Sequence, residues 1–118
     1  MQPRRRRLEV EAIGDVTVVS FTDRNIQDEQ SIQRIGEGLF SLLDEHGRKK
    51  LVLNFGNVEY VASAMLMKLI TLQRKVHGAS GKLVLCNIDS QIHNAFEITK
   101  LDKFFVICDD EQEALQKL

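Results

Sequence analysis

The chain has 118 residues, a length typical of one domain, and 43% of them are hydrophobic, which is enough to build a core. Its formal net charge is −1, so the field of the whole protein gives no reason to expect nucleic acid or an anionic membrane as partner. No apolar run approaches the roughly 20 residues of a membrane helix, and no apolar segment follows the N-terminal charges as in a signal peptide. The composition therefore predicts a soluble, cytoplasmic protein without direct membrane insertion.

The densest run of like charge lies at the N-terminus, where Arg4 to Arg7 are four consecutive arginines. Such a run can hold phosphates, but at a chain end it is more typical of a solvated tail. We therefore assign residues 1–7 to a basic, disordered tail and residues 8–118 to one folded domain.

The first part of the domain predicts a hairpin. Residues 8–13 alternate between apolar and polar side chains, and residues 16–21 are rich in β-branched side chains, with Gly14-Asp15 as a tight turn between the two runs. The two runs should pair as antiparallel strands. Residues 22–27 are polar and contain turn formers, so they predict a loop.

The middle of the chain predicts a helix, a strand and a second helix. Asp28 or Ser31 can begin the first helix, which continues to Glu45 with one apolar face made of Ile32, Ile35, Leu39, Leu42 and Leu43. Gly47 can take the left-handed conformation beyond its end. Residues 51–55 form a short apolar run that fits a central strand. After a loop in which Val58 and Val61 should pack inward, a helix is expected from about Ser63 to His77.

The last part repeats this alternation. Residues 82–86 predict a strand, Asp89 or Ser90 can begin a helix, residues 99–102 predict a turn, and residues 104–107 predict the last strand. Asp109 and Asp110 precede a final helix, where the helix dipole favours negative charge. The order ββαβαβαβα predicts an α/β domain with about four helices and a mixed, mostly parallel sheet behind an N-terminal antiparallel hairpin.

No catalytic, cofactor or metal constellation is evident. The three histidines, His46, His77 and His93, have no metal-ligand spacing, and Ser63 lacks a Gly-x-Ser-x-Gly motif. No glycine-rich phosphate loop follows a strand. Cys86 and Cys108 end apolar runs and are typical of small buried side chains, although a disulfide between them stays open. We therefore expect a protein that is not an enzyme and holds no cofactor or metal.

Ser63 is the most informative single position, and two interpretations stay open for it. The serine can cap the helix that it begins, or it can mark a regulated contact surface. Tyr60, Met67 and Lys68 lie close to it in the sequence and suit an adaptable protein-binding patch. For Met65 we favour a core position, whereas Met67 lies off the apolar stripe and should be exposed.

Three segments carry a family resemblance. The runs Leu51-Val-Leu-Asn-Phe-Gly-Asn-Val-Glu-Tyr-Val-Ala-Ser-Ala-Met-Leu66, Gly81-Lys-Leu-Val-Leu-Cys-Asn87 and Phe96-Glu-Ile-Thr-Lys-Leu-Asp-Lys-Phe-Phe105, with the order of elements, resemble the STAS domain. This family includes bacterial anti-sigma-factor antagonists and the terminal domains of sulfate transporters. The resemblance extends over nearly the whole chain from Leu8 onward and is to the stand-alone, antagonist-type members.

The resemblance implies a partner and a switch. Family members carry an Asp-Ser-Ser/Thr-Gly-Leu motif before the second helix, and a partner that is both anti-sigma factor and serine kinase phosphorylates the first serine. Alignment on Leu66 places Ser63 at this phosphoacceptor position, with Ala62, Ala64 and Met65 in place of the Asp, the second Ser or Thr, and the Gly. The partner-binding residues that we assign are Asp23, Arg24, Asn25, Tyr60, Ala62, Ser63, Ala64, Met65, Met67 and Lys68.

The sequence leaves one alternative of the same family open. The chain could be a STAS accessory or scaffold subunit of a multiprotein assembly or of a lipid-transport ATPase, using the same surface without phosphorylation. A ligand-binding domain or an enzyme with an unrecognised site ranks below both.

Overall fold

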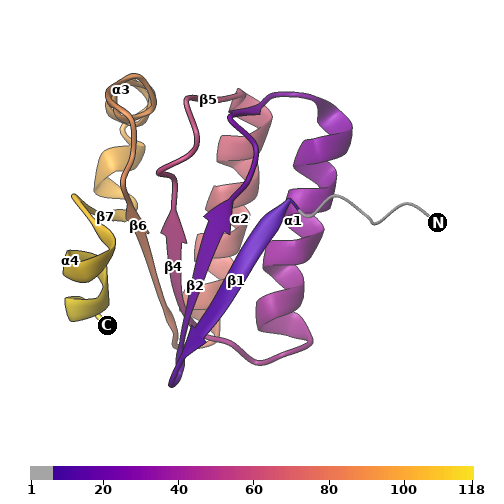
Figure 1. The fold of residues 1–118 in the computed structure, drawn as a ribbon, viewed down its shortest axis with the longest axis vertical. Coiled ribbons are helices and arrows are strands. Elements are labelled where there is room, and N and C mark those ends of the chain that lie inside the picture. The colour runs from indigo at the N-terminus through magenta and orange to yellow at the C-terminus, as the bar shows by residue number, and fades with distance from the viewer. Residues whose placement is uncertain (1–6) are drawn as a thin grey trace.

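The structure, a computed structural model, describes residues 7–118 and has one five-stranded sheet with helices on both faces (Figure 1). The basic tail was predicted at residues 1–7, and residues 1–6 of it lie outside the described residues. The strands are β1 (Leu8–Ile13), β2 (Val16–Phe21), β3 (Asn25–Ile26), β4 (Lys50–Asn54), β5 (Tyr60–Val61), β6 (Lys82–Cys86) and β7 (Val106–Cys108). The helices are α1 (Glu29–Asp44), α2 (Ser63–Gly78), α3 (Ser90–Ile98), the short 3₁₀ helix η1 (Leu101–Lys103) and α4 (Glu111–Gln116).

The main sheet has the order β1-β2-β4-β6-β7, with β1 antiparallel to β2 and every other pairing parallel. This confirms the predicted α/β class, the N-terminal hairpin and the mostly parallel sheet. Strands β4 and β6 are buried over most of their length, because helices cover both faces of a sheet in this arrangement.

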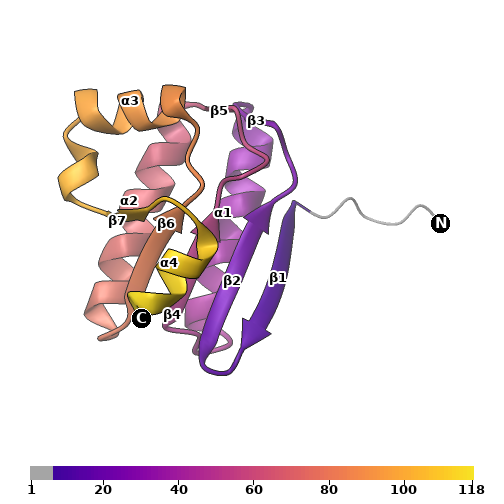
Figure 2. The same ribbon diagram turned by 60° about the vertical axis from the view of Figure 1, so that its left-hand side comes forward.

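Two apolar layers hold the sheet. Figures 1 and 2 show α1 and α2 side by side on one face, with α3 near the end of the sheet where β5 lies and α4 on the opposite face. The larger layer, beneath α1, α2 and α3, includes Phe21, Leu53, Leu69 and Phe96, none of which is exposed. The smaller layer beneath α4 consists of Val18, Val52, Val84, Cys86, Cys108 and Ala114.

Several predicted boundaries needed correction. The loop expected at residues 22–27 contains the short strand β3. The expected strand at residues 104–107 is shifted to Val106–Cys108, because η1 and the turn that follows it occupy residues 101–105. Both missed features are too short to produce a recognisable sequence period.

Other local predictions were confirmed. Asp28, and not Ser31, caps α1: its carboxylate accepts the Ser31 backbone N–H at 2.9 Å. The hydrogen bonds from Ser31 lower the pKa of the Asp28 carboxyl below its ordinary value, as expected for a carboxylate at a helix start. Gly47 is left-handed, with φ +63°, beyond the end of α1.

Candidate functional site

Ser63 is the first residue of α2, and it is not the cap of this helix. The cap position is Ala62, whose extended backbone has φ −76° and ψ 159° and whose side chain offers no hydrogen bond. The capping interpretation of Ser63 is therefore wrong. The reason is that the chain leaves β5 at Val61, which places the turn into the helix one residue earlier than the serine.

The Ser63 side chain is exposed and has no hydrogen-bond partner among residues 7–118. The first backbone N–H groups of a helix lack intrahelical acceptors, and they carry the positive end of the helix dipole. An oxygen-rich group attached to the Ser63 oxygen would therefore lie beside donors that the sequence leaves without a side-chain cap. Ala64, the next residue, is exposed as well.

A two-stranded sheet fixes the segment that precedes Ser63. Strands β3 and β5 are parallel, with Asn25 opposite Tyr60 and Ile26 opposite Val61. The Arg24 carbonyl accepts the Glu59 N–H at 2.7 Å, and the Ile26 carbonyl accepts the Ala62 N–H at 2.8 Å. Ile26 and Val61 are buried, so the sheet also contributes to the core. The loop after β2 and the loop before α2 therefore form one hydrogen-bonded unit.

Two ion pairs border this unit. The Arg7 guanidinium donates to both Asp23 carboxylate oxygens, at 2.8 and 3.0 Å, and the Asp23 side chain is only 12% exposed. This pair joins the start of β1 to the loop after β2. Arg24 pairs with Glu59 at 3.0 Å across the two loops, but both side chains are largely exposed, and such pairs stabilise a fold by about 1 kcal/mol or less. Sequence reasoning placed Arg7 in the basic tail and did not single out Glu59, because the sequence does not show which distant residues these side chains meet.

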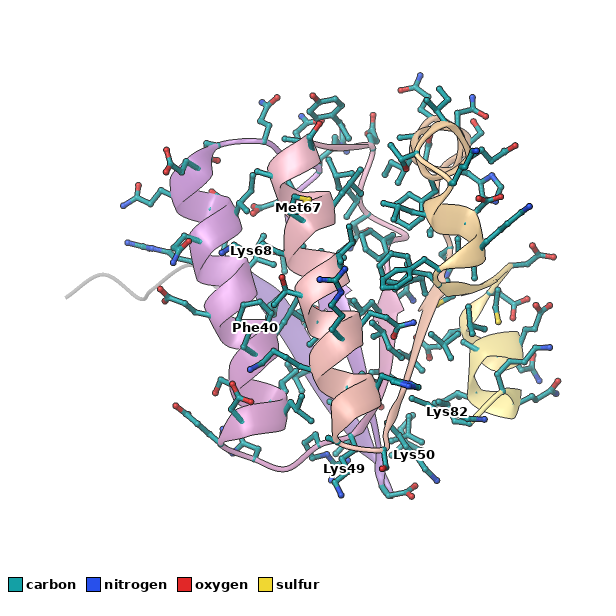
Figure 3. All side chains as sticks on the ribbon, turned by 180° about the vertical axis from the view of Figure 1, so that it is seen from behind. Phe40, Lys49, Lys50, Met67, Lys68 and Lys82 are labelled. Carbon is teal, nitrogen blue, oxygen red and sulfur yellow. The ribbon has the colours of Figure 1, made fainter. Side chains whose placement is uncertain are left out.

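The exposed apolar side chains near Ser63 are Tyr60, 49% exposed, and Met67, 61% exposed. Met67 follows Ser63 by one turn of α2 and points outward, as predicted (Figure 3). Met65 is fully buried, which agrees with its predicted core position, so it supports the surface from below and contributes no exposed area. Ala62 is half-buried and packs against the core.

Lys68 lies on the side of α2 that faces α1. Its side chain crosses Gly36 so closely that an added Cβ there would lie 3.0 Å from the Lys68 Cδ. The ammonium group is 3.3 Å from the Gln33 Oε1 and 6.0 Å from the centre of the Phe40 ring (Figure 3). Lys68 therefore joins the two helices while its charged end reaches the surface. The structure thus brings the predicted residues of three segments to one end of the molecule, and Met65 is the buried one among them.

The described chain offers little other chemistry. Residues 7–118 contain no group of three or more histidine, cysteine or carboxylate side chains placed to hold a metal ion. Cys86 and Cys108 are both free and buried, and burial raises the pKa of the Cys86 thiol to about 12, which keeps it protonated at neutral pH. Among the described helices, none is long and apolar enough to cross a membrane.

Comparison with known proteins agrees on the fold. A curated relative, described as a candidate anti-sigma factor antagonist, BtrV of Bordetella bronchiseptica, is 26% identical over 70 residues, which are 59% of this chain. The match spans about 60% of the length of that relative.

Solved structures with the same fold have low sequence identity. A candidate anti-sigma factor antagonist from Thermotoga maritima has a TM-score of 0.83 at 17% identity, covering 93% of this chain and 92% of its own. A STAS domain protein from Planctomyces limnophilus has a TM-score of 0.83 at 18% identity, covering 93% and 96%. The phosphorylated form of the Bacillus cell fate determinant SpoIIAA has a TM-score of 0.72 at 14% identity, covering 93% and 97%.

The family model of the STAS domain matches residues 7–114, which is nearly the whole chain and includes every strand and all of α1, α2 and α3. The overall fold is thus one that this chain has in common with solved structures of the STAS type. By sequence and by fold, the chain belongs to the STAS domain family.

Proposed function

We propose that this protein is an anti-sigma-factor antagonist that binds an anti-sigma factor through the surface around Ser63 and is released when that serine is phosphorylated. The observation that carries the proposal is the exposed Ser63 hydroxyl at the start of α2, which has no hydrogen-bond partner in residues 7–118, with Tyr60 and Met67 exposed nearby. The named relatives, which are described as anti-sigma factor antagonists, support the choice of partner. The protein contributes a binding surface and an acceptor oxygen, and the kinase partner supplies the chemistry.

A phosphate at Ser63 acts on two free energies with opposite signs. It adds about −1.5 to −2 charges. Within the free protein this charge lies at the positive end of the α2 dipole, which stabilises the helix by about 0.3–1 kcal/mol. In a complex the same charge must be desolvated against the partner, and each 1.4 kcal/mol of lost binding free energy reduces the affinity about tenfold. The binding free energy lost at the interface can therefore exceed the free energy by which the phosphate stabilises α2.

The test measures both free energies on the same variants. A serine kinase of the anti-sigma-factor class from the same genome is incubated with the protein and ATP, and the modified residue is located by mass spectrometry. We expect one phosphate on the wild type and none on Ser63→Ala. Ser63→Glu should bind the partner at least tenfold more weakly while its Tm is equal to or slightly above that of the wild type.

Ser90 provides the matched control. It is also the exposed first residue of a helix, α3, so Ser90→Glu introduces the same charge at a helix start, although α3 is already capped by the Asp89 carboxylate. Ser90→Glu should keep the wild-type affinity. Equal weakening by both substitutions, or phosphorylation of Ser63→Ala, would reject Ser63 as the switch. Full partner binding by Ser63→Glu would instead favour the accessory-subunit alternative, in which this surface acts without phosphorylation.

A further inference from the structure

A pocket lined by lysines lies at the opposite end of the sheet from Ser63. The pocket of about 400 Å³ opens at the N-terminal ends of β4 and β6, whereas Ser63 follows the C-terminal end of β4. Figure 3 shows Lys49, Lys50 and Lys82 gathered at this end of the molecule. Its lining comes from the β1–β2 turn, the α1–β4 connection, the α2–β6 loop and the last residue: Asp15, Gly47, Arg48, Lys49, Lys50, Ser80, Gly81, Lys82 and Leu118.

The side chains around this pocket are unbalanced in charge. Four are cationic, Arg48, Lys49, Lys50 and Lys82, and one is a carboxylate, Asp15. The chain as a whole has a formal net charge of −1, so the excess of positive charge is local. Because a concave surface lined by one sign of charge concentrates the opposite ion, this pocket should attract anions.

The sheet register places two of these charges side by side. Lys50 of β4 and Lys82 of β6 are register partners, and neighbouring strands are about 4.8 Å apart. Like charges at such positions are destabilising. The negative C-terminal ends of α1 and α2 do not account for the presence of two lysines at these positions. A helix dipole acts within the last turn of its helix, and both lysines are strand residues.

Internal partners offset this repulsion only in part. The Lys50 ammonium pairs with the Asp15 carboxylate at 3.0 Å, and the Lys82 ammonium donates to the Lys117 carbonyl at 3.2 Å. The Lys49 ammonium has no hydrogen bond or ion pair with any residue between 7 and 118. An anion in the pocket would therefore meet three ammonium groups. That of Lys49 has no partner among residues 7–118, and those of Lys50 and Lys82 have one partner each.

The frame around the lysines is held by hydrogen bonds. The Lys49 carbonyl accepts the Lys82 N–H at 2.9 Å, and the Val76 carbonyl accepts the Gly81 N–H at 2.8 Å. The Arg48 guanidinium donates to the Gly14 and Val16 carbonyls, at 2.9 and 3.0 Å, and to the Thr17 hydroxyl. The Arg48 guanidinium is thus hydrogen-bonded to the hairpin, so the three lysines are the cations available to contact a ligand.

The lining also indicates the chemistry of that ligand. Ammonium groups are donors without acceptors, and they bind phosphate oxygens as point charges. The volume falls within the range of small-molecule sites, roughly 300–1,000 Å³. None of the described residues that line the pocket is aromatic, so none of them would select a base or another ring. We propose that Lys49, Lys50 and Lys82 bind a small, soluble, phosphate-bearing anion at the end of the sheet opposite Ser63.

The test is a titration of the ¹⁵N-labelled protein with sodium diphosphate at constant ionic strength, followed by amide chemical shifts. Saturable shifts should be concentrated at residues 47–50 and 80–82. Lys49→Ala and Lys82→Ala should each weaken binding about fivefold, which is typical of one exposed charge pair. Lys103→Ala, which removes an exposed lysine of η1, should leave the affinity unchanged.

The variant Asp15→Asn is a second test, because the proposal predicts that it binds diphosphate more tightly than the wild type. Asp15 is exposed, and its pKa is lowered by Lys50, so it is the group that competes with an added anion for that lysine. Removing its charge should tighten diphosphate binding by a few fold. The proposal is overturned if sodium chloride of equal ionic strength produces the same shifts, if Asp15→Asn weakens binding, or if the protein binds anionic phospholipid vesicles but not diphosphate. None of these results bears on Ser63, which is tested separately by phosphorylation.

Discussion

Substitution of Gly81 by alanine tests how tightly the α2–β6 loop is packed against the start of β4. A Cβ at this position would overlap the Lys49 carbonyl oxygen and would lie 2.8 Å from the Lys49 Cβ and 3.0 Å from its carbonyl carbon. Two of these atoms are backbone, so they cannot move aside by a change of rotamer. The clash therefore forces the two chain segments apart.

The cost follows from the contacts that separation would break. Overpacking of a tight site costs about 1–3 kcal/mol, and loss of the Lys82 N–H to Lys49 carbonyl hydrogen bond adds about 0.5–1.5 kcal/mol. We expect Gly81→Ala to lower the free energy of unfolding by about 2–4 kcal/mol. For a domain of this size, that lowers Tm by an amount on the order of 10 °C.

Gly78→Ala is the matched control. Gly78 is the last residue of α2, its φ is not positive, and a Cβ there would meet no atom within 4 Å. Alanine should therefore stabilise the protein by about 0.4–1 kcal/mol. Urea unfolding followed by circular dichroism measures both variants, and an unchanged m value assigns the shift to stability. Equal stability of Gly81→Ala and the wild type, or equal loss in both variants, would refute the packing argument.

Three further predictions concern the cap, the core and a buried thiol. Asp28→Ala should lower Tm because α1 loses its N-terminal cap, whereas Asp28→Asn should retain most of the stability because Asn also accepts the Ser31 N–H. Leu69→Ala should cost about 2–5 kcal/mol, since Leu69 is fully buried, whereas Met67→Ala on the same helix should change stability by less than about 0.5 kcal/mol. The Cys86 thiol has a folded pKa of about 12 against an ordinary value of 9.0. Between these pH values the unfolded chain binds fewer protons, so stability should fall as the pH rises, and a series of urea titrations should show a weaker fall for Cys86→Ala.

The fold was predictable because its signal is distributed over long segments. Residues 51–55 and 82–86 are continuous apolar runs, and the helices between them have one apolar face, so the alternation of parallel strands and crossovers follows from the sequence. Strands β3 and β5 were not predictable, since each has two residues and depends on pairing with a segment over thirty residues away.

The sites were less predictable because they depend on contacts between distant segments. The pairing of Arg7 with Asp23 joins two chain segments that sequence reasoning assigned to a tail and a loop. Likewise, Lys50 and Lys82 become neighbours only through the register of β4 and β6. The sequence contains these charged residues but does not show which of them become neighbours in the fold. The exposure of Met67 was predictable, because it depends on its position around a single helix.

The pairing of β3 with β5 has a consequence for how this surface can change in evolution. The bonds that hold the approach to α2, from Glu59 and Ala62 to the carbonyls of Arg24 and Ile26, are all between main-chain atoms. Main-chain bonds do not depend on the identity of the exposed side chains. The exposed side chains around Ser63 can therefore be exchanged while the path of the backbone stays the same. The specificity of the proposed partner-binding surface can therefore change without a corresponding loss of folding.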